Sequence, residues 1–291
     1  MFVSNSANNG YFYQQRPKYN HSMKSILPSG IACICIAMLI TSCKTEHPPK
    51  KLELSEGLSY IAGGIERAST EKKQLSLVFT AHEYAEGYEV LKETLKKHNV
   101  KGAFFLTGDF YRNPSFAHIV EGLKNDGHYL GAHSDKHLLY CDWGNRDSLF
   151  VTQSELVNDV ADNYKEMERF DISKADAPFY LPPYEWYNDT ISAWVNEMDL
   201  HLINFTGGTS SNADYTTPDM PRYFSSDTIF NRILSYEQTS SHGLNGFILL
   251  THLGAGPERT DKFFERMDAL IDSLTHRGYT IIPLKQLLEK H

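Results

Sequence analysis

The sequence contains very little cysteine. Only four cysteines occur in 291 residues, and Cys33, Cys35 and Cys43 all lie in the N-terminal segment. Cys141 is therefore alone in the rest of the chain, which excludes an internal disulfide bond there. Because exported proteins without disulfides are common, this shortage does not assign the protein to a compartment.

The sequence also lacks an apolar run long enough to cross a membrane as a helix, which takes about 20 residues. The run from Ile31 to Ile40 has no polar side chain but is much shorter than that, and Lys24 precedes it. A positive flank and a short apolar run are typical of a secretory signal. A buried apolar strand that happens to precede a cysteine is the alternative interpretation.

The end of this run, residues 39–43 (Leu-Ile-Thr-Ser-Cys), resembles the lipobox of bacterial lipoproteins. The resemblance implies that Cys43 is lipidated and becomes the first residue of the mature protein. We therefore expect residues 23–43 to be a lipoprotein signal and residues 1–22 to be a non-native start or a disordered segment. The expected location is the bacterial cell envelope, on its periplasmic or outer side, with the lipid anchor in the membrane.

The sequence has fewer basic residues than acidic ones. The chain has 28 Lys and Arg against 36 Asp and Glu, a net charge of −8. Removal of the segment before Cys43 would take away Arg16, Lys18 and Lys24 but no acidic residue, so the charge would fall to −11. A nucleic-acid partner is not expected, since affinity for a phosphate backbone relies on basic patches.

Beyond a tether and lead-in at residues 44–70, short apolar runs alternate with amphipathic segments of helical spacing up to the C-terminus. This alternation predicts a parallel sheet covered by helices, and its density suits a distorted (β/α) barrel of seven or eight strands over residues 71–291. A doubly wound open sheet is the alternative, but no Gly-x-Gly-x-x-Gly or phosphate-loop pattern follows the first strand. The strands are expected at 75–80, 102–107, 128–132, 178–181, 201–205, 247–251 and 279–283, and the helices at 88–99, 116–125, 153–170, 189–198, 261–275 and 284–290.

Polar residues follow several of these strands directly. The carboxyl ends of parallel strands meet at one rim of a barrel, so these side chains are expected to gather there. Two neutral imidazoles four residues apart, His133 and His137, suit Zn²⁺ or a similar transition metal. A catalytic metal site takes a third ligand, for which Glu83 is the candidate and His82 the rival. A chance pair on a solvated helix face is the alternative. The residues at the predicted rim are His82, Glu83, His133, Asp135, His137, Glu185 and His252.

Aromatic residues also cluster near the predicted rim. Tyr140, Trp143, Tyr184 and Trp186 are placed so that they could stack on sugar rings, although core packing is the usual use of such side chains. We expect Tyr140, Trp143 and Trp186 to contact the substrate. The polar residues Asp135, Glu185 and Asp214 are expected to do the same, with a turn or capping role as the alternative for Asp135.

Several of these segments, in this order, resemble the polysaccharide deacetylase homology domain of carbohydrate esterase family 4, from about Leu75 to the C-terminus. Residues 131–137 match its His-Ser/Thr-x-x-His motif, and residues 183–184 match the end of its Arg-x-Pro-Tyr motif. Residues 212–215 resemble its Asp-Trp motif, and residues 250–252 match its Leu-x-His motif. The resemblance implies a distorted (β/α) barrel, a metal ion and an acetylated carbohydrate as substrate.

The resemblance also implies roles for individual residues. His133 and His137 would bind the metal, the Tyr184 backbone N–H would help to hold the oxyanion, and His252 would be the general acid. The sequence departs from the family at its first motif, Thr-Phe-Asp-Asp-Gly, because Thr80 and Ala81 stand where the two aspartates belong. The base and one metal ligand of the family are therefore missing.

The arginine of the third motif is also absent, because Leu181 stands in its place. His82, Glu83 and Glu185 could restore a carboxylate ligand and a base from the same rim. The sequence therefore predicts a metal-dependent hydrolase that removes N- or O-linked acetyl groups from a carbohydrate. A lipid-anchored glycan-binding protein without activity is the main alternative, and a hydrolase of a substrate outside carbohydrate is a third.

Overall fold

The computed structural model of the chain describes residues 52–290. The predictions made for residues 1–22, for the signal at 23–43, for Cys43 and for the first part of the tether lie outside the described residues. No helix within residues 52–290 is both long enough and apolar enough to cross a membrane.

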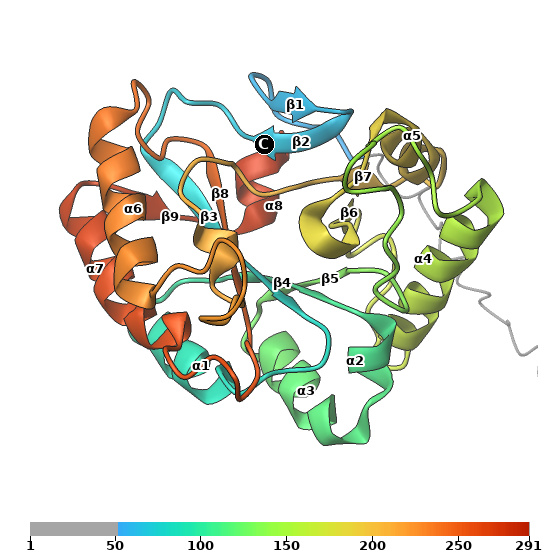
Figure 1. Ribbon diagram of the computed structural model, residues 1–291, viewed down its shortest axis with the longest axis horizontal. Helices are drawn as coiled ribbons and strands as arrows, with labels where there is room; N and C mark the ends of the chain where they lie inside the picture. Colours follow the sequence, from blue (N-terminus) through green and yellow to red (C-terminus); the bar gives the residue numbers. More distant parts are fainter. Residues whose placement is uncertain (1–51, 291) are drawn as a thin grey trace, which may run out of the picture. The chain divides into compact units, whose positions relative to one another are not determined.

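The described region is built around one sheet (Figure 1). From β8 through β3, β4, β5 and β6 to β7 neighbouring strands run parallel, and β9 lies parallel to the start of β3. β1 and β2 pair as an antiparallel hairpin, and β2 runs antiparallel to β8. The strands are β1 (Ser59–Ile61), β2 (Gly64–Arg67), β3 (Gln74–Ala81), β4 (Ala103–Leu106), β5 (Tyr129–Ala132), β6 (Phe179–Tyr180), β7 (His201–Leu202), β8 (Phe247–His252) and β9 (Thr280–Ile281).

The hairpin closes the sheet into a barrel. Ile65 in β2 forms a parallel bridge with Ile203, which lies immediately after β7. The Asn204 N–H donates a hydrogen bond to the Ile65 carbonyl oxygen at 2.7 Å. The ring therefore runs through β2, β8, β3, β4, β5, β6 and β7 and returns to β2. This confirms the predicted distorted (β/α) barrel and excludes the open doubly wound sheet. The closing hairpin itself was not predicted, because strands of three and four residues carry too little periodicity to be detected.

Side chains alternate across the barrel wall, as the pleat of a strand requires. In β3, Val78 faces an apolar cluster inside the barrel, while Leu77 and Phe79 pack outward under the helices. Leu284, Leu287 and Leu288 of α8 join the inner cluster and fill the end opposite the carboxyl ends of the strands. The interior is therefore packed with apolar side chains, and polar chemistry is confined to the rim.

Helices cover the outside of the barrel, as Figure 1 shows for α1, α3, α4, α6 and α7. The Thr152 side chain caps α4 in a capping box with Glu155, directly before the predicted helix start at residue 153. α6 was not predicted, although its Ser225 cap and the buried Ile229 and Ile233 four residues apart are helix signals. The α-helices are α1 (Tyr88–Lys97), α2 (Gly108–Arg112), α3 (Ala117–Asn125), α4 (Gln153–Glu168), α5 (Asp189–Glu197), α6 (Ser226–Thr239), α7 (Met267–His276) and α8 (Leu284–Leu288), with short 3-10 helices at Pro114–Phe116, Pro183–Glu185, Ser211–Ala213 and Phe263–Arg266.

Candidate active site

The two histidines of the predicted metal pair lie side by side at the end of β5. Their ring centroids are 5.1 Å apart, and both sit on a tight loop rather than on a helix. Ser134 and His137 both have positive φ values, 72° and 55°, which bend this loop back on itself. The loop geometry therefore brings together two imidazoles that the sequence separates by four positions.

Two side chains of helix α4 hold this loop in place by hydrogen bonds to its backbone. The Oδ1 atom of Asn163 accepts a hydrogen bond from the His133 N–H at 2.8 Å. One turn earlier on α4, the Oδ1 atom of Asp159 accepts from the backbone N–H groups of Asp135 and Lys136 at 3.2 and 3.1 Å. Residues 159 and 163 share one face of a helix, so both contacts come from a single rigid element.

Both imidazoles of the pair are held in the neutral form that a metal requires. Burial lowers the pKa of His133 to about 3 and that of His137 to about 2, and the neighbouring histidines add to the effect on His137. The Nδ1 atom of His133 lies 2.8 Å from the Leu181 carbonyl oxygen, so Nδ1 carries the proton and donates it there. This contact leaves the Nε2 atom free as a metal ligand, in the arrangement typical of zinc sites.

A third metal ligand is not assembled around this pair. Within residues 52–290, the only three acidic, histidine or cysteine side chains whose ligand atoms lie within 4.8 Å of one another are His98, Asp268 and Asp272. They lie on α1 and α7, away from the loop, and Lys97 already neutralises Asp268 at 2.7 Å. The described residues thus fit a transition metal at two positions, His133 and His137.

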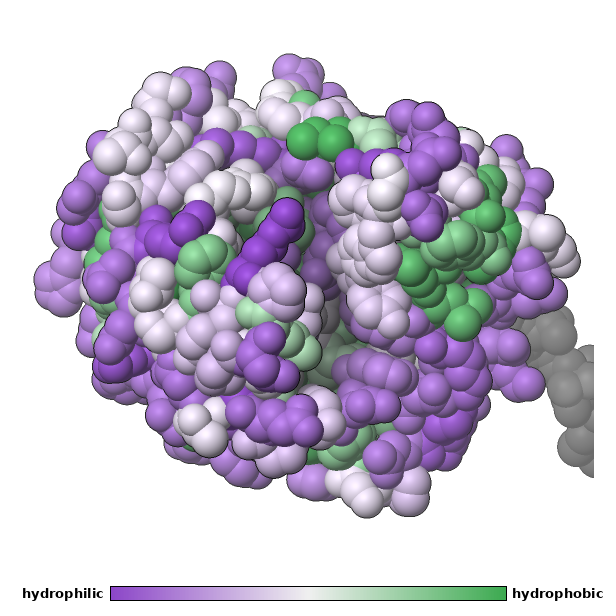
Figure 2. All heavy atoms as spheres, viewed as in Figure 1, coloured by the Kyte–Doolittle hydropathy of each residue, from purple (hydrophilic) through white to green (hydrophobic). Residues whose placement is uncertain are grey.

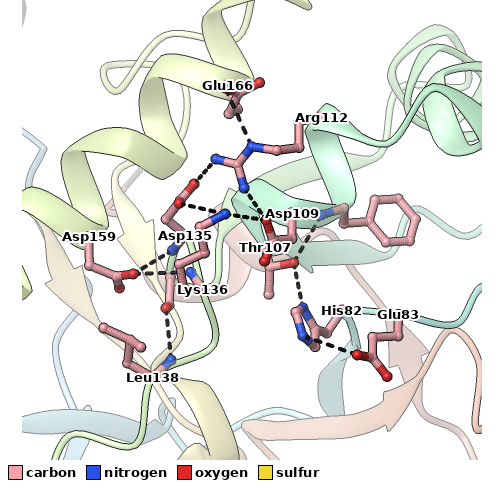
Figure 3. A network of polar contacts seen from close by, with 12 residues as sticks. His82, Glu83, Thr107, Asp109, Arg112, Asp135, Lys136, Leu138, Asp159 and Glu166 are labelled. Atoms are coloured by element: carbon pink, nitrogen blue, oxygen red, sulfur yellow. Dashed lines mark hydrogen bonds and ion pairs between the residues drawn. The ribbon is translucent and has the colours of Figure 1, made fainter. Parts of the chain in front are cut away.

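His82 lies beside His137, and the Glu83 carboxylate lies next to the His82 ring (Figure 3). The His82 ring stacks on His137 with centroids 4.9 Å apart, and its Nδ1 atom lies 3.1 Å from the Thr107 hydroxyl. The Glu83 side chain is 66% exposed, and its carboxylate lies 3.9 Å from the Nε2 atom of His82 on the side facing solvent. His82 is therefore the better placed of the two proposed third ligands, although its role stays a prediction.

Asp135 does not lie where a substrate contact was predicted. Its carboxylate is buried and forms an ion pair with Arg112 of α2, with Lys136 at 3.6 Å (Figure 3). Gly108 makes room for this carboxylate, because a Cβ atom at that position would come within 1.8 Å of Asp135 Oδ1. Asp135 is thus part of the support that ties α2 to the loop, closer to the structural alternative than to substrate binding.

Tyr140 is likewise not available to a substrate. Its side chain is fully buried, and its hydroxyl bonds to Asp159 at 2.7 Å and to the Tyr180 hydroxyl at 2.6 Å. Burial raises the pKa of Tyr140 well above its ordinary value, so it stays protonated and can donate to the Asp159 carboxylate. The predicted stacking role for Tyr140 is therefore wrong, because the ring belongs to the core.

Three other aromatic rings form an open wall beside His137. The Tyr184 ring lies 4.3 Å from the His137 ring, and Trp143 meets Tyr184 edge-on at 5.7 Å and Trp186 at 5.4 Å. Trp143 is 57% exposed and Tyr184 is 42% exposed. Tyr215 is similarly exposed, and its ring lies 5.0 Å from that of His252. Trp143 is therefore open to stacking on a sugar, whereas Trp186 is only partly exposed, and both roles stay predictions.

Tyr184 and Glu185 form a strained turn after β6. Both are non-glycine residues with positive φ, 59° and 53°, which costs each of them roughly 1 kcal/mol. The turn is held by two prolines before it, by the Glu185 N–H donating to the Pro182 carbonyl oxygen at 3.1 Å, and by Asn204 donating to the Glu185 carbonyl oxygen at 3.0 Å. The turn leaves the Tyr184 ring in solvent and drives the Glu185 side chain inward, where only 8% of the residue stays exposed.

His252 ends strand β8 and is oriented by Asp214. The Nδ1 atom of His252 lies 2.6 Å from Asp214 Oδ1, and the His252 backbone N–H donates to Asp214 Oδ2 at 2.9 Å. Burial lowers the pKa of His252, but the Asp214 carboxylate and Glu185 outweigh it, so the pKa is raised above its ordinary value. Asp214 was expected to contact the substrate, whereas both of its carboxylate oxygens accept hydrogen bonds from His252.

Arg259 fixes the loop that carries Asp214 and was not found from the sequence. The side chain is fully buried, and its guanidinium donates to the carbonyl oxygens of Thr216 at 2.6 Å, Phe224 at 3.0 Å and Asp261 at 2.7 Å. Carbonyl oxygens that lie far apart in the chain converge on one cation here. A single arginine between Glu258 and Thr260 carries no sequence signal of such a role.

The position of the missing first aspartate is occupied by a hydroxyl without a partner. Thr80 is 1% exposed, and its Oγ1 atom forms no hydrogen bond within the described residues. In the register of β3 against β8, Thr80 stands next to His252. Figure 2 shows that the face of the molecule seen here is hollowed near its centre, inside the ring of strands. A reacting group would sit at this rim, where His252 lies close enough to act electrostatically on both His133 and His137.

Comparison with known proteins agrees with this geometry. Residues 67–203 match the sequence model of the polysaccharide deacetylases. This stretch, just under half of the chain, resembles the deacetylase domain of that family. The deacetylase domain thus carries the family's histidine pair, and β8 beyond the matched residues adds His252.

The deacetylase domain is similar to curated bacterial proteins. One is a peptidoglycan-N-acetylglucosamine deacetylase from Bacillus cereus, 23% identical over 218 residues that cover 75% of this chain and 69% of the relative. Another is a peptidoglycan-N-acetylmuramic acid deacetylase from Bacillus subtilis, 30% identical over 117 residues that cover 40% of this chain and 39% of the relative.

Solved structures share the fold of the deacetylase domain. A pseudoenzyme of carbohydrate esterase family 4 from Bacillus anthracis superimposes with a TM-score of 0.61 at 19% identity, over 78% of this chain and 69% of that one. At this identity the likeness concerns the fold alone. It fits the closed, distorted barrel described above.

A cavity of about 830 Å³ also exists away from these residues. It is lined by residues of β2, β7 and α8, including Ile65, Leu202 and Glu289, and includes none of the rim histidines. Substrate sites are often found in large cavities, but the polar groups needed for hydrolysis converge at the rim instead. We therefore place the candidate active site at the rim.

Proposed function

We propose that this chain removes acetyl groups, N- or O-linked, from a carbohydrate. The observation that carries the proposal is the pairing of His133 and His137 with an aspartate-oriented His252 at the rim of a deacetylase-family barrel. The open aromatic wall formed by Trp143, Tyr184 and Trp186 supports a sugar as the substrate. The two curated relatives act on peptidoglycan, which makes an acetylated glycan of the cell envelope the first substrate to test.

The rim supplies the groups that acyl hydrolysis needs at fixed positions. His252 is held by Asp214 in the orientation that lets its Nε2 atom give a proton to the leaving amine or alcohol. The Tyr184 backbone N–H would help to hold the oxyanion. The reaction also needs a base that takes a proton from water, and the sequence offers three candidates for it, namely His82, Glu83 and Glu185.

His133 and His137 would hold a divalent transition metal, most simply Zn²⁺, because both imidazoles are neutral and the Nε2 atom of His133 is free. Such an ion, when bound, polarises the acetyl carbonyl and lowers the pKa of water. His82 or Glu83 would provide the third ligand, and the stacked position of His82 favours it over the exposed Glu83.

The second candidate function is glycan binding without catalysis. The residues Thr80 and Ala81 in place of two aspartates favour it, since neither side chain can act as a base or bind the metal strongly. The aromatic wall would serve binding equally well. In both cases we propose export, with a lipid anchor at Cys43 that holds the domain at the cell envelope and no nucleic acid as a partner.

One experiment separates these functions. Purified protein is assayed for bound metal by mass spectrometry, for acetate release from acetylated chitooligosaccharides, xylan and peptidoglycan, and for glycan binding with and without a chelator. Acetate release that is lost on chelation and in His133→Ala supports the hydrolase. Glycan binding that survives chelation, with no acetate release from any substrate, contradicts the hydrolase and supports the binding protein.

A further inference from the structure

Glu185 is a buried carboxyl group that the fold leaves without a partner. Only 8% of the residue is exposed, and its carboxylate forms no hydrogen bond or ion pair within residues 52–290. Buried carboxylates are normally paired, because burying an isolated charge is costly. A side chain kept in this state is a candidate for direct chemistry.

The backbone around Glu185 is built to hold this side chain inward. The chain adopts positive φ at two successive residues, Tyr184 and Glu185, where glycine would carry no strain. Asn204, itself buried, donates to the Glu185 carbonyl oxygen at 3.0 Å and fixes the peptide that follows the side chain. Strain that the surrounding structure maintains in this way is concentrated at functional sites.

The groups that face Glu185 are those of the proposed reaction. His252 of β8 and Asp214, which follows the 3-10 helix Ser211–Ala213, both act electrostatically on its carboxyl group, and Glu185 in turn acts on Tyr215. Thr80, whose position lacks the expected aspartate, stands beside His252 in the sheet and leaves its hydroxyl unpaired. Glu185 therefore lies within electrostatic range of His252, whose neighbour in the sheet is Thr80.

We propose that Glu185 is the general base of this chain and takes over the task of the aspartate that Thr80 replaces. The assignment rests on the proposed deacetylase function. The Glu185 carboxylate takes one proton from water, and the water oxygen bonds to the acetyl carbonyl carbon. The bond from that carbon to the sugar nitrogen or oxygen then breaks, and the leaving atom keeps the electron pair and takes a proton from His252. Acetate and the free amine or hydroxyl result, and the proton on Glu185 passes through solvent to restore His252.

Glu185 suits this task better than the two other candidates. The Glu83 side chain is 66% exposed and faces solvent. The Nδ1 atom of His82 is already within hydrogen-bonding distance of the Thr107 hydroxyl, at 3.1 Å. A carboxylate in water is a weak base, whereas burial raises the pKa of Glu185 to about 7, with His252 opposing and Asp214 reinforcing the effect. A base whose pKa lies close to the working pH is the most effective one.

The test compares Glu185→Gln, which keeps the shape but removes the base, with Glu121→Gln, the same change at an exposed position on α3. In the full chain loaded with metal, Glu185→Gln is expected to lower kcat by about 10²- to 10⁴-fold with little change in KM, while Glu121→Gln matches the wild type. The acidic limb of the wild-type pH profile, near pH 7, should disappear in Glu185→Gln. Added formate should restore part of the activity of Glu185→Ala, because the shorter alanine side chain leaves room for a formate ion.

A second readout needs no turnover. The pKa of the Glu185 carboxyl group, measured by carbon NMR, is expected near 7, and a value near 4.5 would overturn the assignment. Retained activity in Glu185→Gln with large loss in Glu83→Gln would overturn it as well and identify Glu83 instead. If the wild type released no acetate from any acetylated glycan, the proposed function would fail, and the assignment of Glu185 as a base would fail with it.

Discussion

Replacing Asp214 by Asn is expected to lower the pKa of His252 and, with it, the rate of deacetylation at neutral pH. The carboxylate lies 2.6 Å from the Nδ1 atom of His252 and also accepts the His252 N–H at 2.9 Å. Asn carries no charge and has a single acceptor atom, Oδ1, so it can keep only one of these two hydrogen bonds. The substitution therefore removes the charge of the pair together with one hydrogen bond.

The size of the effect follows from the burial of the two groups. Asp214 is 3% exposed and the His252 side chain 17% exposed, so solvent screens the pair only in part. Opposite unit charges about 4 Å apart at an effective dielectric constant of about 20 attract by about 4 kcal/mol, which corresponds to about 3 pKa units. Allowing for relaxation and residual water, we expect a fall of about 1 to 2 units. Burial and Arg259 would then hold the pKa of His252 below its ordinary value.

Two measurements check this prediction. The pKa of His252 is followed by NMR, and kcat/KM is measured against pH, whose alkaline limb should move to lower pH by the same amount because the general acid must be protonated. Asp219→Asn, the same change at an exposed position of the same loop, is the control and should move neither. An unchanged pKa for His252 in Asp214→Asn would refute the electrostatic reasoning.

The same pair has a consequence for stability. The pKa of His252 is higher in the folded chain than in the unfolded one, so its contribution to the free energy of unfolding is full below about pH 6.5. That contribution is lost as pH rises through the folded-state pKa. The difference in unfolding free energy between the wild type and Asp214→Asn should therefore shrink as pH rises, and a difference that grows would show that the sign is wrong.

Three further predictions follow from the site. His133→Ala should reduce bound metal at least tenfold, measured by mass spectrometry, with circular dichroism as the control for folding; unchanged metal content would exclude His133 as a ligand. Trp143→Ala should raise KM for a chitooligosaccharide about 3- to 10-fold and leave kcat unchanged, as expected for an exposed stacking ring; an effect on kcat alone would contradict this. Arg112→Met should lower the free energy of unfolding by about 2–3 kcal/mol in urea, because it leaves the buried Asp135 carboxylate with only Lys136 at 3.6 Å; adding Asp135→Asn should recover part of the loss, and no recovery would contradict the ion-pair explanation.

Much of the fold was predictable because its signals are local. The apolar runs of β3, β4, β5 and β8 are buried strands, and their alternation with helices was sufficient to predict a (β/α) barrel. Strand ends also predicted the placement of His133, His137 and His252, since parallel strands deliver their carboxyl ends to one rim. The β1–β2 hairpin that closes the barrel was missed, because its function is a long-range pairing between Ile65 and Ile203.

The predicted substrate contacts show where local signals end. Position along the chain placed Asp135, Tyr140 and Asp214 near the rim, and all three are indeed near it. Their side chains turn to Arg112, to Asp159 and to His252, respectively. Each partner lies 19 to 38 residues away in the sequence, so no spacing rule connects the two.

The sequence by itself determined the barrel and placed the histidine pair and His252 at its rim, because a strand and the loop after it are specified by a few consecutive residues. Tertiary structure decided how the carboxylates are used. Glu83 faces solvent, Asp135 is neutralised by Arg112, Asp214 orients His252, and only Glu185 remains buried and unpaired. Exposure and electrostatic environment depend on segments that meet only in the folded chain, and these two quantities set whether a carboxyl group can act as a base.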